Sequence, residues 1–137
     1  MGPPPHTTAQ GFDALYGLRI RELEDGHVRA EVEVREQLTQ AQGRVHGGVY
    51  AALAESLASL GSAAAATSSG AEAIPESNQM SFLRPITAGA IHATARAVHR
   101  GRTTWVWEVE ITDDRRQLCA LARMTVALRS QRERTRL

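Results

Sequence analysis

The sequence predicts an α+β domain in which one long buried helix is wrapped by a curved antiparallel sheet of about six strands. The helix is predicted from residues 48–66, a proline-free segment dominated by alanine and leucine, which are strong helix formers. The sheet is predicted from shorter segments on both sides of the helix that alternate apolar and polar residues. A sheet curved around the helix is the simplest arrangement that buries it.

Two strands are expected before the helix. A short mixed run at residues 15–23 leads into Glu24-Asp25-Gly26, which is a strong turn signal. Residues 28–35 then alternate, with three valines and an alanine on one face and charged residues on the other. Such a strand has one buried and one solvated face, which favours an antiparallel sheet. Residues 36–44 form a polar connection to the helix.

The helix itself is expected to end at small polar residues and Gly70. Nearly all of its faces are apolar or small, so we expect protein on every side of it. The same apolarity raises the question of a membrane span. Its main contributor is alanine, however, and Glu55 would place a charge near the middle of a bilayer, which is costly. We therefore expect the core helix of a soluble domain.

Four strands are expected after the helix, and three of them alternate clearly. Arg84-Pro85 interrupts the first, Arg100-Gly101 makes a turn, and residues 113–116 form a hairpin loop. The four strands span residues 72–83, 91–98, 105–112 and 118–128.

The composition is that of an ordinary globular chain, and 137 residues suffice for one domain. We divide the chain into a flexible leader (1–10), a domain (11–130) and a basic tail (131–137). With 16 basic and 15 acidic residues, no overall field attracts nucleic acid or a membrane. All the basic residues are arginine, which excludes Schiff-base chemistry.

Cysteine usage and the N-terminus indicate a cytoplasmic protein. Cys119 is the only cysteine and cannot form an internal disulfide, and no signal-peptide pattern is present. The sequence also has no cluster with metal-ligand spacing, no phosphate-binding loop and no dinucleotide fingerprint, so neither a metal nor a cofactor is expected.

His46-Gly47-Gly48, at the start of the predicted helix, is the first candidate for chemistry. Glycines allow close approach of a ligand and dihedral angles that other residues avoid. The first amides of a helix have no internal partners and lie at the positive end of its dipole, so they could hold a developing oxyanion. The alternative is a glycine loop that merely connects a strand to a helix.

Glu55 is the second candidate, because it is the only Asp, Glu or Arg between Arg44 and Glu72. An isolated carboxylate is costly to bury unless it is paired or used. It lies nine residues, about two and a half turns, beyond His46, and Ser59 shares its face one turn further on. The alternatives are an exposed strip of the helix and a subunit interface; with the glycines nearby, catalysis is favoured.

The run VHGGVYAALAE at residues 45–55, followed by Ser59, resembles the hotdog-fold acyl-CoA thioesterases. Within them the chain is most similar to the 4-hydroxybenzoyl-CoA thioesterases of the Arthrobacter type. Residues 77–85, 103–107 and 116–120 add to this similarity, which covers roughly residues 12–132.

The resemblance implies a role for each matching residue. Glu55 would attack the thioester carbonyl or activate a water, and the two routes stay open. The Gly47 amide would polarise that carbonyl and His46 would orient the loop. Gln40 would position the thioester or the leaving thiolate, and Ser59 would aid the water or the aromatic group. The residues that match CoA contacts are Arg84, Thr103 and Arg132, with Arg102 standing where relatives have a small hydroxyl residue.

The resemblance also implies a site between two subunits, hence a homodimer that assembles to a tetramer. The substrate expected first is 4-hydroxybenzoyl-CoA, and Gln42 replaces a bulky residue before the site, so acyl specificity can differ. Rival activities are 1,4-dihydroxy-2-naphthoyl-CoA or broad-range acyl-CoA hydrolysis. Hydration of enoyl-thioesters and non-catalytic acyl-CoA binding are more distant alternatives.

Overall fold

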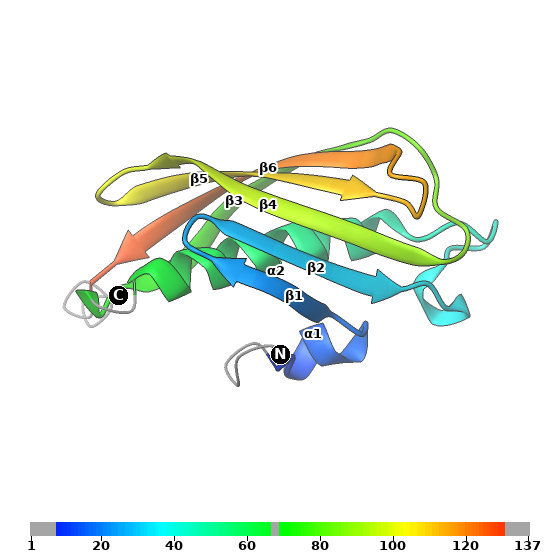
Figure 1. Cartoon of the computed structure of the whole chain (residues 1–137), viewed down its shortest axis with the longest axis horizontal. Helices are drawn as coiled ribbons and strands as arrows, with labels where there is room; N and C mark the ends of the chain where they lie inside the picture. Colours follow the sequence, from blue (N-terminus) through cyan, green and yellow to red (C-terminus); the bar gives the residue numbers. More distant parts are fainter. Residues whose placement is uncertain (1–7, 67–68, 131–137) are drawn as a thin grey trace.

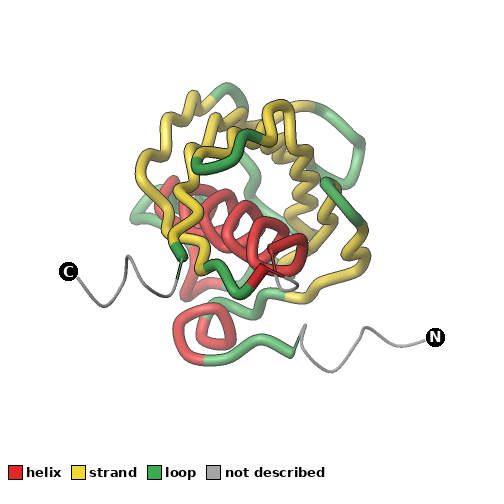
Figure 2. Tube along the Cα trace, turned by 90° about the vertical axis from the view of Figure 1, so that its left-hand side faces the viewer, coloured by secondary structure: helices red, strands yellow, loops and turns green. Residues whose placement is uncertain are grey.

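The computed structural model describes residues 8–66 and 69–130 of the chain. Figure 1 shows a single sheet that curves over a long helix, and Figure 2 shows the same helix seen nearly end-on inside the curve. This is the predicted hotdog arrangement, and the prediction is confirmed. The elements are α1 (Gly11–Leu15), β1 (Arg19–Glu24), β2 (His27–Glu33), η2 (Glu36–Leu38), α2 (Gly47–Ala66), β3 (Glu72–Phe82), β4 (Ala90–Arg100), β5 (Thr104–Thr112) and β6 (Leu118–Arg129).

The six strands pair antiparallel in the order β1-β2-β4-β5-β6-β3. The strand that directly follows α2 therefore does not join its predecessors but crosses to the far edge, beside β6. Only one side of β3 is paired with a described strand. β3 is thus a long edge strand, and its free side offers unpaired backbone donors and acceptors.

The core lies between the concave face of the sheet and one face of α2. The alternation predicted for β2, β4, β5 and β6 is observed as alternating burial, with apolar side chains pointing toward the helix. Trp107 is fully buried, and its indole Nε1–H donates a 2.7 Å hydrogen bond to the Ser62 hydroxyl of α2. A Cβ at Gly61 would overlap the Trp107 ring and come within 2.9 Å of Val28. This contact explains the glycine inside the helix.

The expectation that α2 has protein on every side is wrong for the single chain. Its buried residues lie along the face toward the sheet, whereas Glu55, Ala63 and Ala64 on the opposite side are exposed. The sheet curves around only part of the helix, and α1 covers a little more (Figure 2). By length and composition alone α2 is also able to cross a membrane, as core helices often are; in this chain it packs on the sheet.

Two short helices were not predicted: α1 precedes β1, and η2 lies in the segment expected to be a polar connection. Neither has a side-chain cap at its N-terminus. The usual sequence signal of a helix start is therefore missing, and tertiary contacts fix both segments instead.

Candidate active site

The start of α2 leaves one backbone donor unused. The Gly48 N–H donates to Nδ1 of His46 at 2.8 Å, and the Val49 N–H donates to the His46 carbonyl at 2.9 Å. The Gly47 N–H has no acceptor among the described residues. His46 thus occupies its neighbours' donors and leaves the Gly47 donor at the positive end of the helix dipole available for a ligand. The roles of Gly47 and His46 in catalysis stay predictions.

Gly47 and Gly48 are required by close approach. A Cβ at Gly47 would lie 2.8 Å from Cε1 of Phe82, and a Cβ at Gly48 would lie 2.9 Å from Nδ1 of His46. Neither glycine has a positive φ. The expectation of unusual dihedral angles is therefore wrong here. The close packing of the Phe82 ring and of the His46 side chain is what favours glycine at these two positions. Phe82 was not anticipated as a site residue, and no local signal marks it.

Gln40 shares a hollow of about 430 Å³ with Gly47. Its backbone N–H donates to the Arg44 carbonyl at 2.7 Å, and its Oε1 accepts the Gln42 N–H. The NH₂ group of the Gln40 side chain has no acceptor among the described residues. It is therefore free to donate a hydrogen bond to a ligand. The hollow is lined by Gln40, Arg44, Val45, Gly47, Tyr50, Phe82, Leu83, Arg84 and Pro85.

Two arginines give this hollow a positive rim. Arg44 and Arg84 are exposed, and neither forms an ion pair with a described residue. Tyr50 also lines this hollow, and burial raises its pKa to about 12. Burial likewise raises the pKa of the Cys119 thiol, as expected for a structural cysteine.

Glu55 and Ser59 line a different hollow, of about 610 Å³, on the open face of α2. Glu55 is exposed and makes no ion pair or hydrogen bond with the described part of the chain. The expectation of a buried carboxylate is wrong for a single subunit. The Ser59 hydroxyl, one turn away, is itself inaccessible and has no hydrogen-bond partner. The hollow is bordered at one end by Asp13 and Ser56 and at the other by residues 71–73, where β3 begins.

A single chain does not bring the predicted residues together. Gly47 and Glu55 are eight residues apart on one helix, which corresponds to about 12 Å along its axis. One carbonyl group cannot contact both, since reacting atoms must lie about 3 Å apart.

The predicted CoA contacts are also dispersed. Arg84 borders the Gly47 hollow, whereas Thr103 lines another hollow beside Glu76 and Arg129, near the beginning of β3. About 33 Å separates the two ends of β3. Arg102 is exposed in the turn before β5 and borders none of these hollows, and Arg132 lies outside the described residues.

A hydrogen-bonded group next to Glu55 was not predicted from the sequence. Asp13 of α1 accepts hydrogen bonds from the Ser56 hydroxyl at 2.6 Å and from the Tyr16 hydroxyl at 3.0 Å. Burial raises the pKa of Tyr16, and the negative charges of Asp13 and Glu55 raise it further. The Ser56–Asp13 hydrogen bond joins residues 43 positions apart, so local patterns could not reveal it.

No group of three or more His, Cys, Asp or Glu side chains within residues 8–66 and 69–130 is arranged to hold a metal ion. The groups that face the two hollows are the Gly47 backbone N–H, the Gln40 side-chain amide and the Glu55 carboxylate.

Comparison with known proteins identifies the family. The thioesterase superfamily model matches residues 42–120, which contain Gly47, Glu55 and most of the sheet. A Mycobacterium tuberculosis protein named as an esterase is 40% identical over 114 residues, which cover 82% of this chain and 81% of that protein. Its solved structure has a TM-score of 0.82 and covers 85% of this chain and 94% of that one.

Two further relatives are informative. The 1,4-dihydroxy-2-naphthoyl-CoA hydrolase of Listeria monocytogenes is 36% identical, over 90% of this chain and 99% of that protein. A Staphylococcus aureus thioesterase is 31% identical, with a TM-score of 0.84 over 87% of this chain and 98% of that one. Its solved variants replace a glutamine and a glutamate fifteen positions apart, the same separation as Gln40 and Glu55. The chain belongs to the thioesterase superfamily and is a thioester hydrolase.

Proposed function

We propose that this thioesterase hydrolyses aromatic acyl-CoA esters to the free acid and CoA, at a site shared by two subunits. One observation carries the proposal: α2 presents a free backbone donor at Gly47 and a free carboxylate at Glu55. Thioester hydrolysis needs both, a donor where negative charge develops on the carbonyl oxygen and a nucleophile or base at the carbonyl carbon.

A second copy of the chain supplies the missing neighbour, because its Glu55 can face a Gly47 that lies about 12 Å from the Glu55 of its own helix. The Gly47 hollow is bordered by the end of β3, at Phe82, and the Glu55 hollow by its beginning, at Glu72. If the free edges of two β3 strands pair antiparallel about a two-fold axis, the end of one strand lies beside the beginning of the other. The Glu55 carboxylate of one subunit then faces the Gly47 amide of its partner.

The same pairing unites the dispersed CoA contacts. Arg84 of one subunit approaches Thr103 and Arg129 of the other, because those residues lie at opposite ends of β3. Arg44 and Arg84 border the Gly47 hollow and suit the phosphates of CoA. Arg102 and Arg132 are further proposed phosphate contacts. We propose that two such dimers form the tetramer.

The reaction then follows from the positions of the donors. The substrate carbonyl accepts the Gly47 N–H, and the Gln40 amide donates to the thioester sulfur. Glu55 either attacks the carbonyl carbon, giving a mixed anhydride that water cleaves, or removes a proton from an attacking water. Ser59 would hold this water once its hydroxyl, inaccessible in the single chain, turns toward the hollow that its residue lines. In both routes the C–S bond breaks, and the thiolate leaves and takes up a proton to give CoA.

The substrate proposed first is 4-hydroxybenzoyl-CoA, and 1,4-dihydroxy-2-naphthoyl-CoA is the second candidate. The Listeria relative, which matches nearly end to end, favours the bicyclic ester. The test is thiol release from both esters together with benzoyl-, crotonyl-, acetyl- and octanoyl-CoA. A kcat/KM that is highest for an aryl ester supports the proposal. Preference for octanoyl-CoA over every aryl ester overturns the aromatic assignment and leaves a broad-range thioesterase.

Enoyl-thioester hydration is disfavoured by the state of His46. Its Nδ1 accepts the Gly48 N–H, so the neutral ring carries its proton on Nε2 and has no lone pair left to act as a base. Hydration of crotonyl-CoA without thiol release would support the lyase instead. A non-catalytic binder is disfavoured because it has no use for an unpaired carboxylate beside the acyl-CoA site. We place the enzyme in the cytoplasm, with acyl-CoA and its own second copy as partners.

A further inference from the structure

Asn78 is a polar residue at a core-facing position of β3. It pairs in register with Met124 of β6, which is fully buried on the concave face of the sheet. Because directly paired residues of an antiparallel sheet point to the same face, the Asn78 side chain points toward α2. Its Nδ2 donates a 3.0 Å hydrogen bond to the Ala51 carbonyl. This bond accounts for a side-chain amide on a face where apolar residues are usual.

Ala51 lies halfway between the two proposed catalytic groups, four residues after Gly47 and four before Glu55. Each N–H of an α-helix bonds to the carbonyl four residues earlier, so Ala51 is bonded to Gly47 on one side and to Glu55 on the other. The Ala51 carbonyl has a second lone pair, and the Asn78 amide donates to it. Asn78 therefore holds the part of the helix that joins the oxyanion donor to the carboxylate.

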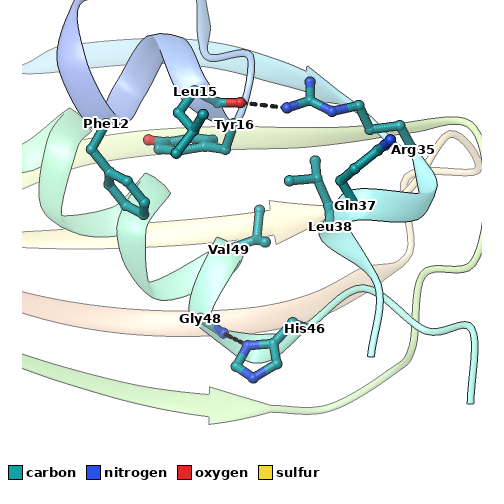
Figure 3. A pocket seen from close by; sticks show the side chains of 9 residues that line it. All are labelled: Phe12, Leu15, Tyr16, Arg35, Gln37, Leu38, His46, Gly48 and Val49. Atoms are coloured by element: carbon teal, nitrogen blue, oxygen red, sulfur yellow. Dashed lines mark hydrogen bonds between the residues drawn. The ribbon is translucent and has the colours of Figure 1, made fainter. Parts of the chain in front are cut away.

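The catalytic part of α2 is held at its two ends as well. At its start, the His46 ring accepts the Gly48 N–H (Figure 3). At its far end, the Ser56 hydroxyl donates to Asp13 of α1. These two contacts come from the loop before the helix and from α1. The contact made by Asn78 comes from β3, the strand whose free edge pairs with a second copy in the proposed dimer.

We infer that Asn78 is a positioning residue, which fastens α2 to the interface strand so that Glu55 of one subunit faces Gly47 of the other. This inference rests on the proposed function and adds a residue that acts through Ala51 and not through the substrate. Pairing of two β3 edges about a two-fold axis places the middle of β3, where Asn78 lies, between the two sites of the dimer. Asn78 is exposed in the single chain, and the partner strand covers it in the dimer. Its hydrogen bond is stronger there, because water is excluded.

The test replaces the Asn78 amide in the full-length protein by side chains with and without a donor. Asn78→Leu keeps a similar volume and removes the donor. In Asn78→His, the imidazole Nδ1–H lies as many bonds from Cα as the lost Nδ2–H, so it restores the donor. The matched control is Gln79→Leu, the same kind of change at an exposed neighbour that points to the opposite face of β3.

The steady-state constants are measured with the acyl-CoA ester that the wild-type enzyme hydrolyses fastest. Asn78→Leu lowers kcat about tenfold and leaves KM unchanged, because the misplaced groups act on the carbonyl whereas other residues hold CoA. Asn78→His recovers most of the lost kcat, and Gln79→Leu has wild-type constants. Amide hydrogen exchange of residues 51–55 is faster in Asn78→Leu than in Gln79→Leu.

Each contrary result has its own meaning. A wild-type kcat in Asn78→Leu, or no recovery of kcat in Asn78→His, overturns the inference. A raised KM with unchanged kcat overturns it by placing Asn78 at the substrate. Dissociation of Asn78→Leu in analytical ultracentrifugation overturns it by making Asn78 an interface contact only. A wild-type enzyme that releases no thiol from any acyl-CoA overturns the proposed function instead, whereas unchanged hydrogen exchange in Asn78→Leu overturns the Asn78–Ala51 contact alone.

Discussion

The ring of Phe82 packs directly on the backbone of Gly47, so that a methyl group at Gly47 would lie 2.8 Å from Cε1 of the ring. Phe82 is the residue that ends β3. The proposed oxyanion donor is therefore in contact with a residue 35 positions away in the chain.

Gly47→Ala is expected to lower kcat by about 10²–10³, because the new methyl group and the Phe82 ring must move apart and carry the donor with them. Phe82 is 60% exposed, so its removal leaves the core intact. The double variant Gly47→Ala/Phe82→Ala therefore recovers much of the lost kcat relative to Gly47→Ala. Absence of recovery would mean that the methyl group blocks the substrate directly. Steady-state thiol release measures both effects.

Glu55→Ala is expected to lower turnover by about 10²–10⁴ or more while the protein stays folded. The side chain is exposed and unpaired within the described chain, so its loss breaks no contact in the subunit. Glu33→Ala, at an exposed position at the end of β2, is the matched control with normal turnover. Near wild-type activity in Glu55→Ala would remove this residue from the mechanism. In wild-type enzyme, a single turnover in H₂¹⁸O that labels Glu55 identifies the nucleophilic route.

Mixed oligomers test whether the site spans two subunits. Gln40→Ala and Glu55→Ala each inactivate both sites of a dimer made of one variant. In a mixed dimer, one site combines the intact Gln40 of one subunit with the intact Glu55 of the other. Co-expression is therefore expected to restore about a quarter of wild-type activity, since half of randomly paired dimers are mixed and one of their two sites works. A site contained in one chain predicts no recovery.

Ser62→Ala is expected to lower the free energy of unfolding by about 1–3 kcal/mol, because it leaves the buried Trp107 Nε1–H without an acceptor. Ser59→Ala is the matched control on the same helix. Its hydroxyl has no hydrogen-bond partner, so its removal costs little. Urea denaturation of the two variants gives the comparison. Equal stability of the two would show that the Trp107 hydrogen bond contributes nothing net.

The pH dependence of stability is expected to include Glu31. A hydrogen bond from the Arg21 guanidinium, with the charges of Arg21 and Arg19, holds the pKa of Glu31 below its ordinary 4.5. A carboxyl with a lowered folded-state pKa adds stability above that ordinary value and loses it as the pH falls through the folded-state pKa. In Arg21→Gln the Glu31 titration seen by NMR therefore moves up toward 4.5. An unchanged midpoint would contradict the assigned cause.

The positions of the catalytic candidates along one helix could be predicted from the sequence, but their arrangement in space could not. The spacing of His46, Gly47 and Glu55 follows from one helix, and helical geometry is local. Whether Glu55 is buried, and what faces it, depends on the curvature of the sheet. Full burial of the helix was expected because its residues are nearly all small or apolar. The sheet of one subunit, however, covers only one side of the helix.

By itself the sequence determined the helix, the strands and the buried face of β2, β4, β5 and β6, because periods of 3.6 and 2 residues can be read from consecutive positions. Only the tertiary structure decided that β3 crosses to the open edge and that Gly61 fits beneath Trp107. It also decided that Phe82 covers Gly47 and that Asp13 ties α1 to Ser56. Such contacts join residues that are distant in the chain, and their energies depend on packing and pairing in three dimensions. The distance between Gly47 and Glu55 is set by the rise of their one helix, and it is too long for both to serve one substrate within a single chain.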